Sequence, residues 1–72
     1  MSIEELKELL KKDMAYFMDD VKHWEHRIQT TTDNPIYESS RRSWIRSKDI
    51  SLSKWEYARK ILSILERVEN EN

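Results

Sequence analysis

The sequence predicts an all-α protein, an antiparallel hairpin of two long helices, and three observations support this fold. Gly is absent and Pro occurs once, at Pro35, whereas a β-rich domain of this length needs several tight turns that usually recruit Gly. Apolar residues recur at gaps of three and four in both halves of the chain. A polar, Thr-rich segment separates these halves. We therefore expect one helical domain over residues 1–72.

The first helix is expected at about residues 2–28. Ser2 and Glu5 have the spacing of a capping box, in which each side chain satisfies an otherwise unpaired backbone N–H. Eight apolar positions then fall within an arc of roughly 80° at about 100° per residue. This narrow stripe predicts an amphipathic helix, and its members are Ile3, Leu6, Leu10, Met14, Phe17, Val21, Trp24 and Ile28.

Residues 29–34 predict a loop. Three consecutive Thr residues lower helix propensity because their χ1 angles are restricted. Asn34 is disfavoured in the α region because Pro35 follows it. The same pair suits a new helix, with Asn34 as the N-cap and Pro35 at the first helical position.

The second helix is expected at about residues 35–68, followed by a frayed tail at 69–72. It carries two adjacent apolar stripes, which indicate two packing partners. The first stripe faces helix 1 and the second is expected to face another copy of the chain. The first comprises Trp55, Ala58, Leu62 and Leu65, and the second comprises Tyr57, Ile61, Ile64 and Val68.

Folding the chain at the centre of the loop makes facing residue numbers sum to about 64–65. Large side chains then meet small ones, as close packing requires. This register pairs Trp24 with Ser40, Val21 with Trp44, Phe17 with Ser47 and Leu6 with Ala58. The expected core comprises Leu10, Phe17, Val21, Trp24, Trp44, Trp55 and Leu62.

An alternative with three helices remains open. Ile45 and Leu52 fall on the polar side of a continuous second helix, and Ser53 with Glu56 forms another capping box. A break near residues 49–53 would turn both apolar side chains inward.

The function favoured by these patterns is protein interaction. An uncovered apolar stripe on a monomer would form a patch that monomers seldom expose, so we expect a homodimer that completes a four-helix bundle. Regulators, adaptors and inhibitors act through surfaces of this kind. The candidate partner or dimer surface comprises Leu9, Tyr16, Ile50, Tyr57, Ile61, Ile64 and Val68, with Ile45 and Leu52 as outlying members.

A basic stretch at residues 41–54 indicates a nucleic-acid-binding regulator as the alternative function. Residues 39–60 carry seven basic and two acidic side chains, net +5, whereas residues 1–38 carry five basic and nine acidic, net −4. The expected register brings Arg41, Arg42 and Arg46 near Asp19, Asp20 and Glu25, which would neutralise part of this excess. The candidate nucleic-acid contacts are Arg41, Arg42, Arg46, Lys48 and Lys54.

A weak candidate metal site comprises Asp19, His23 and His26, which share one face of the first helix at spacings of four and three. That face lies opposite the apolar stripe, and nothing nearby resembles a general base or a supporting shell. A solvated helix face explains these residues better, and we expect no metal and no cofactor.

Catalysis is not expected. The chain has no Cys nucleophile and no Gly-rich phosphate loop, and a two-helix hairpin cannot enclose a desolvated pocket. No apolar run approaches the ~18–20 residues that span a bilayer, and the charged N-terminus is unlike a signal peptide, so a cytoplasmic location is expected. No motif identifies a family. The chain resembles, in size and shape alone, small helical regulators and inhibitors encoded by bacteria and their phages.

Overall fold

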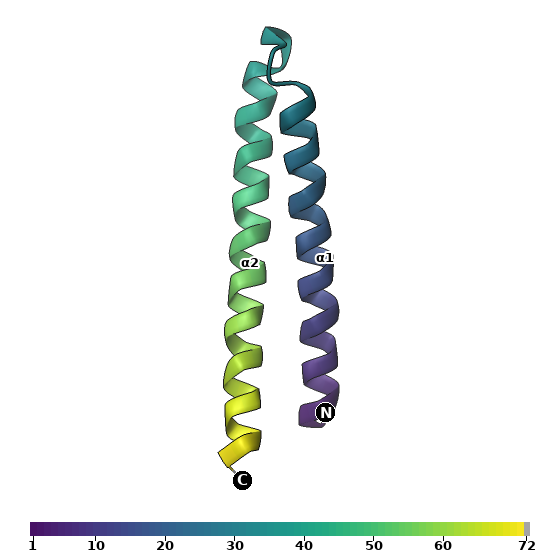
Figure 1. Cartoon of the computed structure of the whole chain (residues 1–72), viewed down its shortest axis with the longest axis vertical. Coiled ribbons are helices and arrows are strands. Elements are labelled where there is room, and N and C mark those ends of the chain that lie inside the picture. The colour runs from purple at the N-terminus through teal and green to yellow at the C-terminus, as the bar shows by residue number, and fades with distance from the viewer. Residues whose placement is uncertain (72) are drawn as a thin grey trace.

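The chain is an antiparallel two-helix hairpin in a computed structural model that describes residues 1–71 (Figure 1). Helix α1 spans Ile3–Thr30, a short 3₁₀ helix η1 spans Pro35–Tyr37, and helix α2 spans Glu38–Glu71. No strand occurs among residues 1–71. The predicted all-α hairpin is therefore confirmed.

The second helix is continuous, so the three-helix alternative is wrong. Residues 49–53 are helical throughout. Leu52 is half-buried, and Ile45 stays 44% exposed on the unbroken helix. The helix also runs beyond the predicted end at residue 68. Residues 69–71 are helical, whereas a frayed tail was expected there. Asn72 lies outside the described residues.

The helix starts follow the predicted capping residues. The Glu5 N–H donates to the Ser2 hydroxyl at 3.1 Å, and that hydroxyl donates to the Glu5 carboxylate at 3.3 Å. The carboxylate thus binds the Ser2 hydroxyl in place of the backbone N–H that a full capping box uses. At the second start, the Ile36 N–H donates to the Asn34 side chain at 3.1 Å, with Pro35 in the first turn. Here the cap opens η1, which leads directly into α2.

The threonines extend helix α1 rather than ending it at 28. The hydroxyls of Thr30 and Thr31 donate to the Arg27 carbonyl, and the Thr32 hydroxyl donates to the Ile28 carbonyl at 3.0 Å. These carbonyls belong to the last turn of the helix, where the hydroxyls add to the backbone hydrogen bond from the Thr31 N–H to the Ile28 carbonyl at 3.3 Å. The Thr side chains therefore stabilise the end of the helix that their low propensity was expected to weaken.

The helices pair in a different register from the predicted one. Asp20 accepts a hydrogen bond from the Ser51 hydroxyl at 2.7 Å, the Arg27 guanidinium lies 4.6 Å from the Trp44 ring centroid, and Lys54 lies 5.9 Å from that of Phe17. In each pair the residue numbers add to 71, not to 64–65. The cause is the longer first helix and η1, which move the fold point about three residues along the chain.

The new register changes the facing pairs but preserves which sides of the helices meet. The shift of six to seven residues on one helix is close to two full turns. By this register, Trp24 lies opposite Ser47 instead of Ser40, and Leu6 lies opposite Leu65 instead of Ala58. The predicted pairs of Val21 with Trp44 and Phe17 with Ser47 are wrong for the same reason.

The core is smaller than predicted. Leu10, Val21 and Ala58 are buried, and no side chain among residues 1–71 is completely enclosed. The other expected core residues are half-buried, because each helix has one neighbour and cannot be surrounded. These are Phe17, Trp24, Trp44, Trp55 and Leu62.

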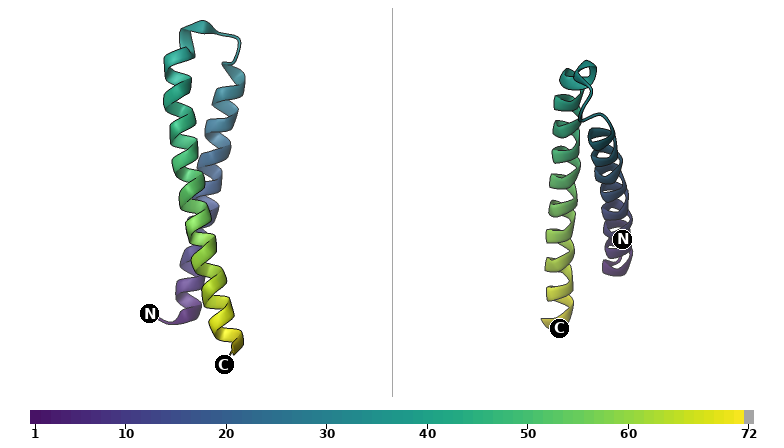
Figure 2. Two further views of the ribbon diagram at one scale, coloured as in Figure 1. Left: turned by 90° about the vertical axis from the view of Figure 1, so that its left-hand side faces the viewer. Right: turned by 45° about the horizontal axis from the view of Figure 1, so that its top comes forward.

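An ion pair joins the open ends of the hairpin. The Lys7 ammonium lies 2.9 Å from the Glu69 carboxylate and 3.7 Å from that of Glu4. The hydrogen bond between Lys7 and Glu69 raises the pKa of Lys7 and lowers the pKa of Glu69. The rod measures 56 × 15 × 15 Å, and its helices cross at a shallow angle (Figure 2).

Candidate functional site

The most distinctive surface feature is an apolar groove between the helices. It has a volume of about 370 Å³ and lies in the half of the hairpin that holds the termini. Helix α1 contributes one wall and helix α2 the other. The lining residues are Leu10, Asp13, Phe17, Ser53, Lys54, Tyr57, Ala58 and Ile61.

Helix α1 continues this apolar surface outward from the groove. Asp13 lines the groove, and Leu9 and Tyr16 lie four residues before and three residues after it. Residues at these spacings share one face of a helix. Both side chains are exposed, Tyr16 by 70%. Its ring also contacts Phe17 edge-on, at 6.1 Å between centroids.

Helix α2 continues the surface on the other side. Ile50 and Ile64 lie seven residues before and after Tyr57, and Val68 lies seven after Ile61. Seven residues make nearly two turns, so all five side chains point to one side of the helix. Tyr57 is 69% exposed and Ile64 is 50% exposed. We call the whole set the apolar face, defined as Leu9, Tyr16, Ile50, Tyr57, Ile61, Ile64 and Val68.

The two outlying members of the predicted surface lie elsewhere. Leu52 is nine residues before Ile61, which places it half a turn away, on the opposite side of α2. Ile45 is seven residues before Leu52 and shares its side. The structure thus places seven of the nine predicted contact residues on one side of the hairpin and these two on another, where Ile45 lines a second groove that Ile50 also reaches.

The predicted nucleic-acid contacts do not form one site, because Arg41 and Lys48 lie apart from Arg42, Arg46 and Lys54. The Arg41 guanidinium donates to the carbonyl oxygens of Thr31 and Asn34, so it closes the loop. Lys48 is half-buried beside α1. Arg42 has Glu38 as an ion partner at 4.0 Å. Arg46 is exposed and, within residues 1–71, lies in no ion pair.

A second shallow groove runs along the outer face of α2 and contains the exposed cations. It joins basic and apolar side chains with one acidic residue. The lining residues are Arg42, Ile45, Arg46, Asp49, Ile50, Ser53 and Lys54.

The predicted neutralisation of Arg41, Arg42 and Arg46 by helix α1 is wrong. No salt bridge between these residues and Asp19, Asp20 or Glu25 is present in the described part of the chain. The shifted register explains the loss for Asp20, whose carboxylate accepts from the Ser51 hydroxyl, whereas Glu25 and Arg46 are both exposed and form no ion pair within residues 1–71.

Both tryptophans of α2 have a cation over the ring. The Arg27 guanidinium lies 4.6 Å from the Trp44 centroid, and the Arg59 guanidinium lies 5.5 Å from that of Trp55. Cations at these distances are attracted to the ring face. These rings, half-buried and covered, are poor platforms for stacking nucleic-acid bases.

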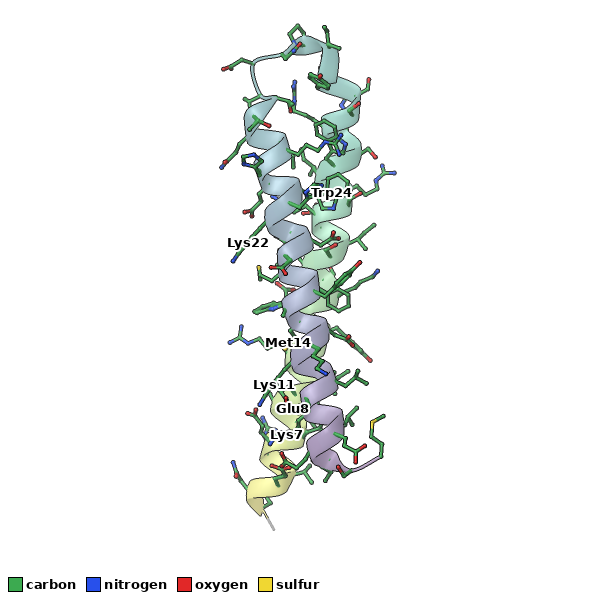
Figure 3. All side chains as sticks on the ribbon, turned by 90° about the vertical axis from the view of Figure 1, so that its right-hand side faces the viewer. Lys7, Glu8, Lys11, Met14, Lys22 and Trp24 are labelled. Carbon is green, nitrogen blue, oxygen red and sulfur yellow. The ribbon has the colours of Figure 1, made fainter. Side chains whose placement is uncertain are left out.

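The candidate metal residues Asp19, His23 and His26 are all exposed on α1. Among residues 1–71, no group of three side chains is arranged to hold a metal ion. The His23 ring instead contacts Trp24, at 5.2 Å between centroids. In Figure 3, Trp24 turns toward α2 whereas Lys22 projects away from it.

Sequence reasoning missed Asp13 and Lys54 as a pair in the apolar groove. They line opposite walls of the same groove, yet lie 41 positions apart in the chain. Only the register of the helices brings them together. Lys7 and Glu69 were missed for the same reason.

Neither described helix is long and apolar enough to cross a membrane. Comparisons with protein-family models, curated proteins and solved structures found no match for this chain.

Proposed function

We propose that this chain is a non-enzymatic interaction module, a regulator, adaptor or inhibitor that binds another protein through the apolar face. The single observation that carries the proposal is the gathering of seven large apolar residues from both helices on one side of the hairpin. Contiguous exposed apolar surface of this kind marks interaction sites on proteins. Docking of two further helices on this side would complete a four-helix bundle.

The surface area of the chain supports this proposal. The hairpin exposes 5776 Å², whereas a compact protein of 8.8 kDa exposes about 4,800 Å². The excess is about 1,000 Å², close to the roughly 800 Å² that each partner buries in a stable protein complex. The small core supports it as well, since a chain of this size rarely reaches stability without a disulfide, a metal or a partner.

The proposal is tested by placing charges on the apolar face. Replacing both Ile61 and Ile64 with Glu should abolish association at micromolar concentration, because unpaired charges are costly to bury. Analytical ultracentrifugation of parent and variant gives the association state, and circular dichroism shows whether the helices persist. A helical variant that still forms the oligomer of the parent would contradict the proposal.

Adjacent residues provide a matched control. Ile64→Glu and Ser63→Glu add the same charge one residue apart, and both positions are exposed. Only Ile64 belongs to the apolar face. We therefore expect association to weaken in Ile64→Glu and to persist in Ser63→Glu.

A second candidate function is nucleic-acid binding through the outer face of α2. The observation that favours it is the groove that gathers Arg42, Arg46 and Lys54 on one side of the helix. Against it stand Asp49 in the same groove and the covered tryptophan rings. The salt dependence of binding separates the two functions, since phosphate contacts weaken steeply as salt rises.

A further inference from the structure

We infer that the partner of the apolar face is a second copy of this chain, related by a two-fold axis parallel to the long axis of the hairpin. Both loops then lie at the same end of the assembly, and α1 of one protomer lies over α2 of its partner. This inference rests on the proposed function, because it names the occupant of the same face.

The charged residues of the groove carry the inference. Asp13 and Lys54 are exposed, lie on different helices and line the same apolar groove. No ion pair joins them within the described chain. An apolar face with one acidic and one basic group is self-complementary, because a two-fold axis can bring each charge to its opposite in the partner.

The parallel two-fold axis places these charges together. A rotation about this axis leaves the height of each residue along the rod unchanged. Each α1 residue therefore lies over the same position of the partner's α2 that it faces in the α2 of its own chain. Asp13 therefore lies over Ala58 of the partner, four residues from the partner's Lys54, which is about 6 Å of helix rise. The lysine side chain is long enough to span that offset, and the arrangement forms the pair twice.

The apolar residues of the face match in the same arrangement. Leu9 faces position 62 by the register of the hairpin, so it lies over the turn that presents Ile61 and Ile64 of the partner. Tyr16 lies over position 55, between the partner's Lys54 and Tyr57. Apolar side chains of α1 thus cover the middle of the partner's α2 face, around Tyr57, Ile61 and Ile64.

A two-fold axis perpendicular to the long axis of the hairpin would give an interface with unfavourable charge contacts. The apolar face is centred at position 59 of α2, midway between Ile50 and Val68. The register places position 59 opposite position 12 of α1. Asp13 would then lie beside its own copy near the axis, and Lys54 would lie against Ile64 of the partner. Like charges in an interface and an unpaired buried lysine both oppose association.

Reciprocal charge reversal tests the arrangement. Asp13→Lys places two lysines together twice per dimer, and Lys54→Asp places two aspartates together twice. Each variant alone should dimerise at least about tenfold more weakly than the parent. Mixed in equal amounts, the two variants should form a heterodimer as tight as the parent, since every cross-chain pair is then of opposite charge. Native mass spectrometry of the mixture counts the species.

The matched control uses the same charge changes outside the face. Asp19→Lys and Lys60→Asp lie on the outward sides of α1 and α2 and are exposed. The two chains of this mixture differ in net charge by as much as the Asp13→Lys and Lys54→Asp chains do. The long-range electrostatic attraction between the chains is therefore equal in the two mixtures. We expect the Asp19→Lys and Lys60→Asp variants to pair at random, so that both homodimers form beside the heterodimer.

Three outcomes would overturn the inference. A statistical mixture from Asp13→Lys and Lys54→Asp would exclude the cross-chain pair. Tighter dimers of Asp13→Asn than of the parent would favour the perpendicular axis, because that change relieves a repulsion. A parent that stays monomeric at all concentrations would exclude the second copy, while leaving the proposed function open for a different protein on the same face.

Discussion

At the residue scale, burial is uneven along each helix. Leu10, Val21 and Ala58 pack directly against the facing helix and are buried. Phe17 and Trp55 are half-buried, with Lys54 and Arg59 over their rings. Each of these aromatic rings is therefore partly shielded from solvent and has a cation nearby. The stability of the hairpin depends most on the few side chains that are buried.

Truncation of a buried side chain tests this distribution. Leu10→Ala should lower the free energy of unfolding by about 2–5 kcal/mol, the usual cost of removing a buried leucine side chain. Ile36→Ala should change it by no more than about 0.5 kcal/mol, because Ile36 is 82% exposed near the loop. Urea denaturation at one protein concentration measures both changes. Equal changes for the two variants would show that the core lies elsewhere.

At the element scale, side-chain hydrogen bonds to the backbone determine the ends of the helices. The hydroxyls of three threonines bind the last carbonyls of α1, and Asn34 caps η1. Arg41 then binds two loop carbonyls and joins the loop to α2. These bonds fix the length of the connection and therefore the register of the helices. At the other end the helices are joined by the ion pair of Lys7 with Glu69.

The Lys7–Glu69 pair predicts a pH dependence. The hydrogen bond lowers the pKa of Glu69 below its ordinary value of 4.5 and raises the pKa of Lys7 above 10.5. The pair therefore stabilises the folded state between these two values. Its contribution is lost on the acid side as Glu69 is protonated and on the basic side as Lys7 loses its proton.

Comparison with a neutral variant measures this contribution. The parent should exceed Glu69→Gln in thermal stability at about pH 7, and the difference should shrink as the pH falls below 4.5 and Glu69 is protonated. Glu71→Gln is the control, since Glu71 lies two residues away and is exposed. A difference from Glu69→Gln that persists at low pH would show that the pair does not join the helix ends in solution.

At the scale of the whole molecule, the hairpin is extended rather than compact. Its radius of gyration is 16.4 Å, whereas a compact domain of this length has about 11 Å. Charge also varies along the rod. Residues 1–10 and 61–72 at the open end each carry net −2, and residues 11–60 carry net +3. The open end is thus acidic, and the rest of the rod carries the excess of positive charge.

This charge separation predicts weak, salt-sensitive contact with nucleic acids. We expect a labelled duplex to be retarded in a gel only at low salt and not at about 0.15 M, where exposed charges are screened beyond about 8 Å. The variant with Ala at Arg42 and Arg46 should lose the low-salt retardation and keep the association state of the parent. Retardation of the parent at physiological salt, abolished in this variant, would establish nucleic-acid binding instead.

The sequence by itself determined the fold class, the helix starts and the membership of the apolar stripes. Local patterns specify these features: capping residues at Ser2 and Asn34, a spacing of three and four, and the absence of Gly. The tertiary structure alone decided the register, and with it the loss of the expected Arg–Asp contacts and the placement of Asp13 and Lys54 in one groove. Register depends on the length of the connection, and hydrogen bonds of Thr30, Thr31 and Arg41 that no spacing rule predicts set that length. Shifting one helix by two turns keeps the same faces in contact while it changes every facing pair, so periodicity specifies the faces and leaves the partners undetermined.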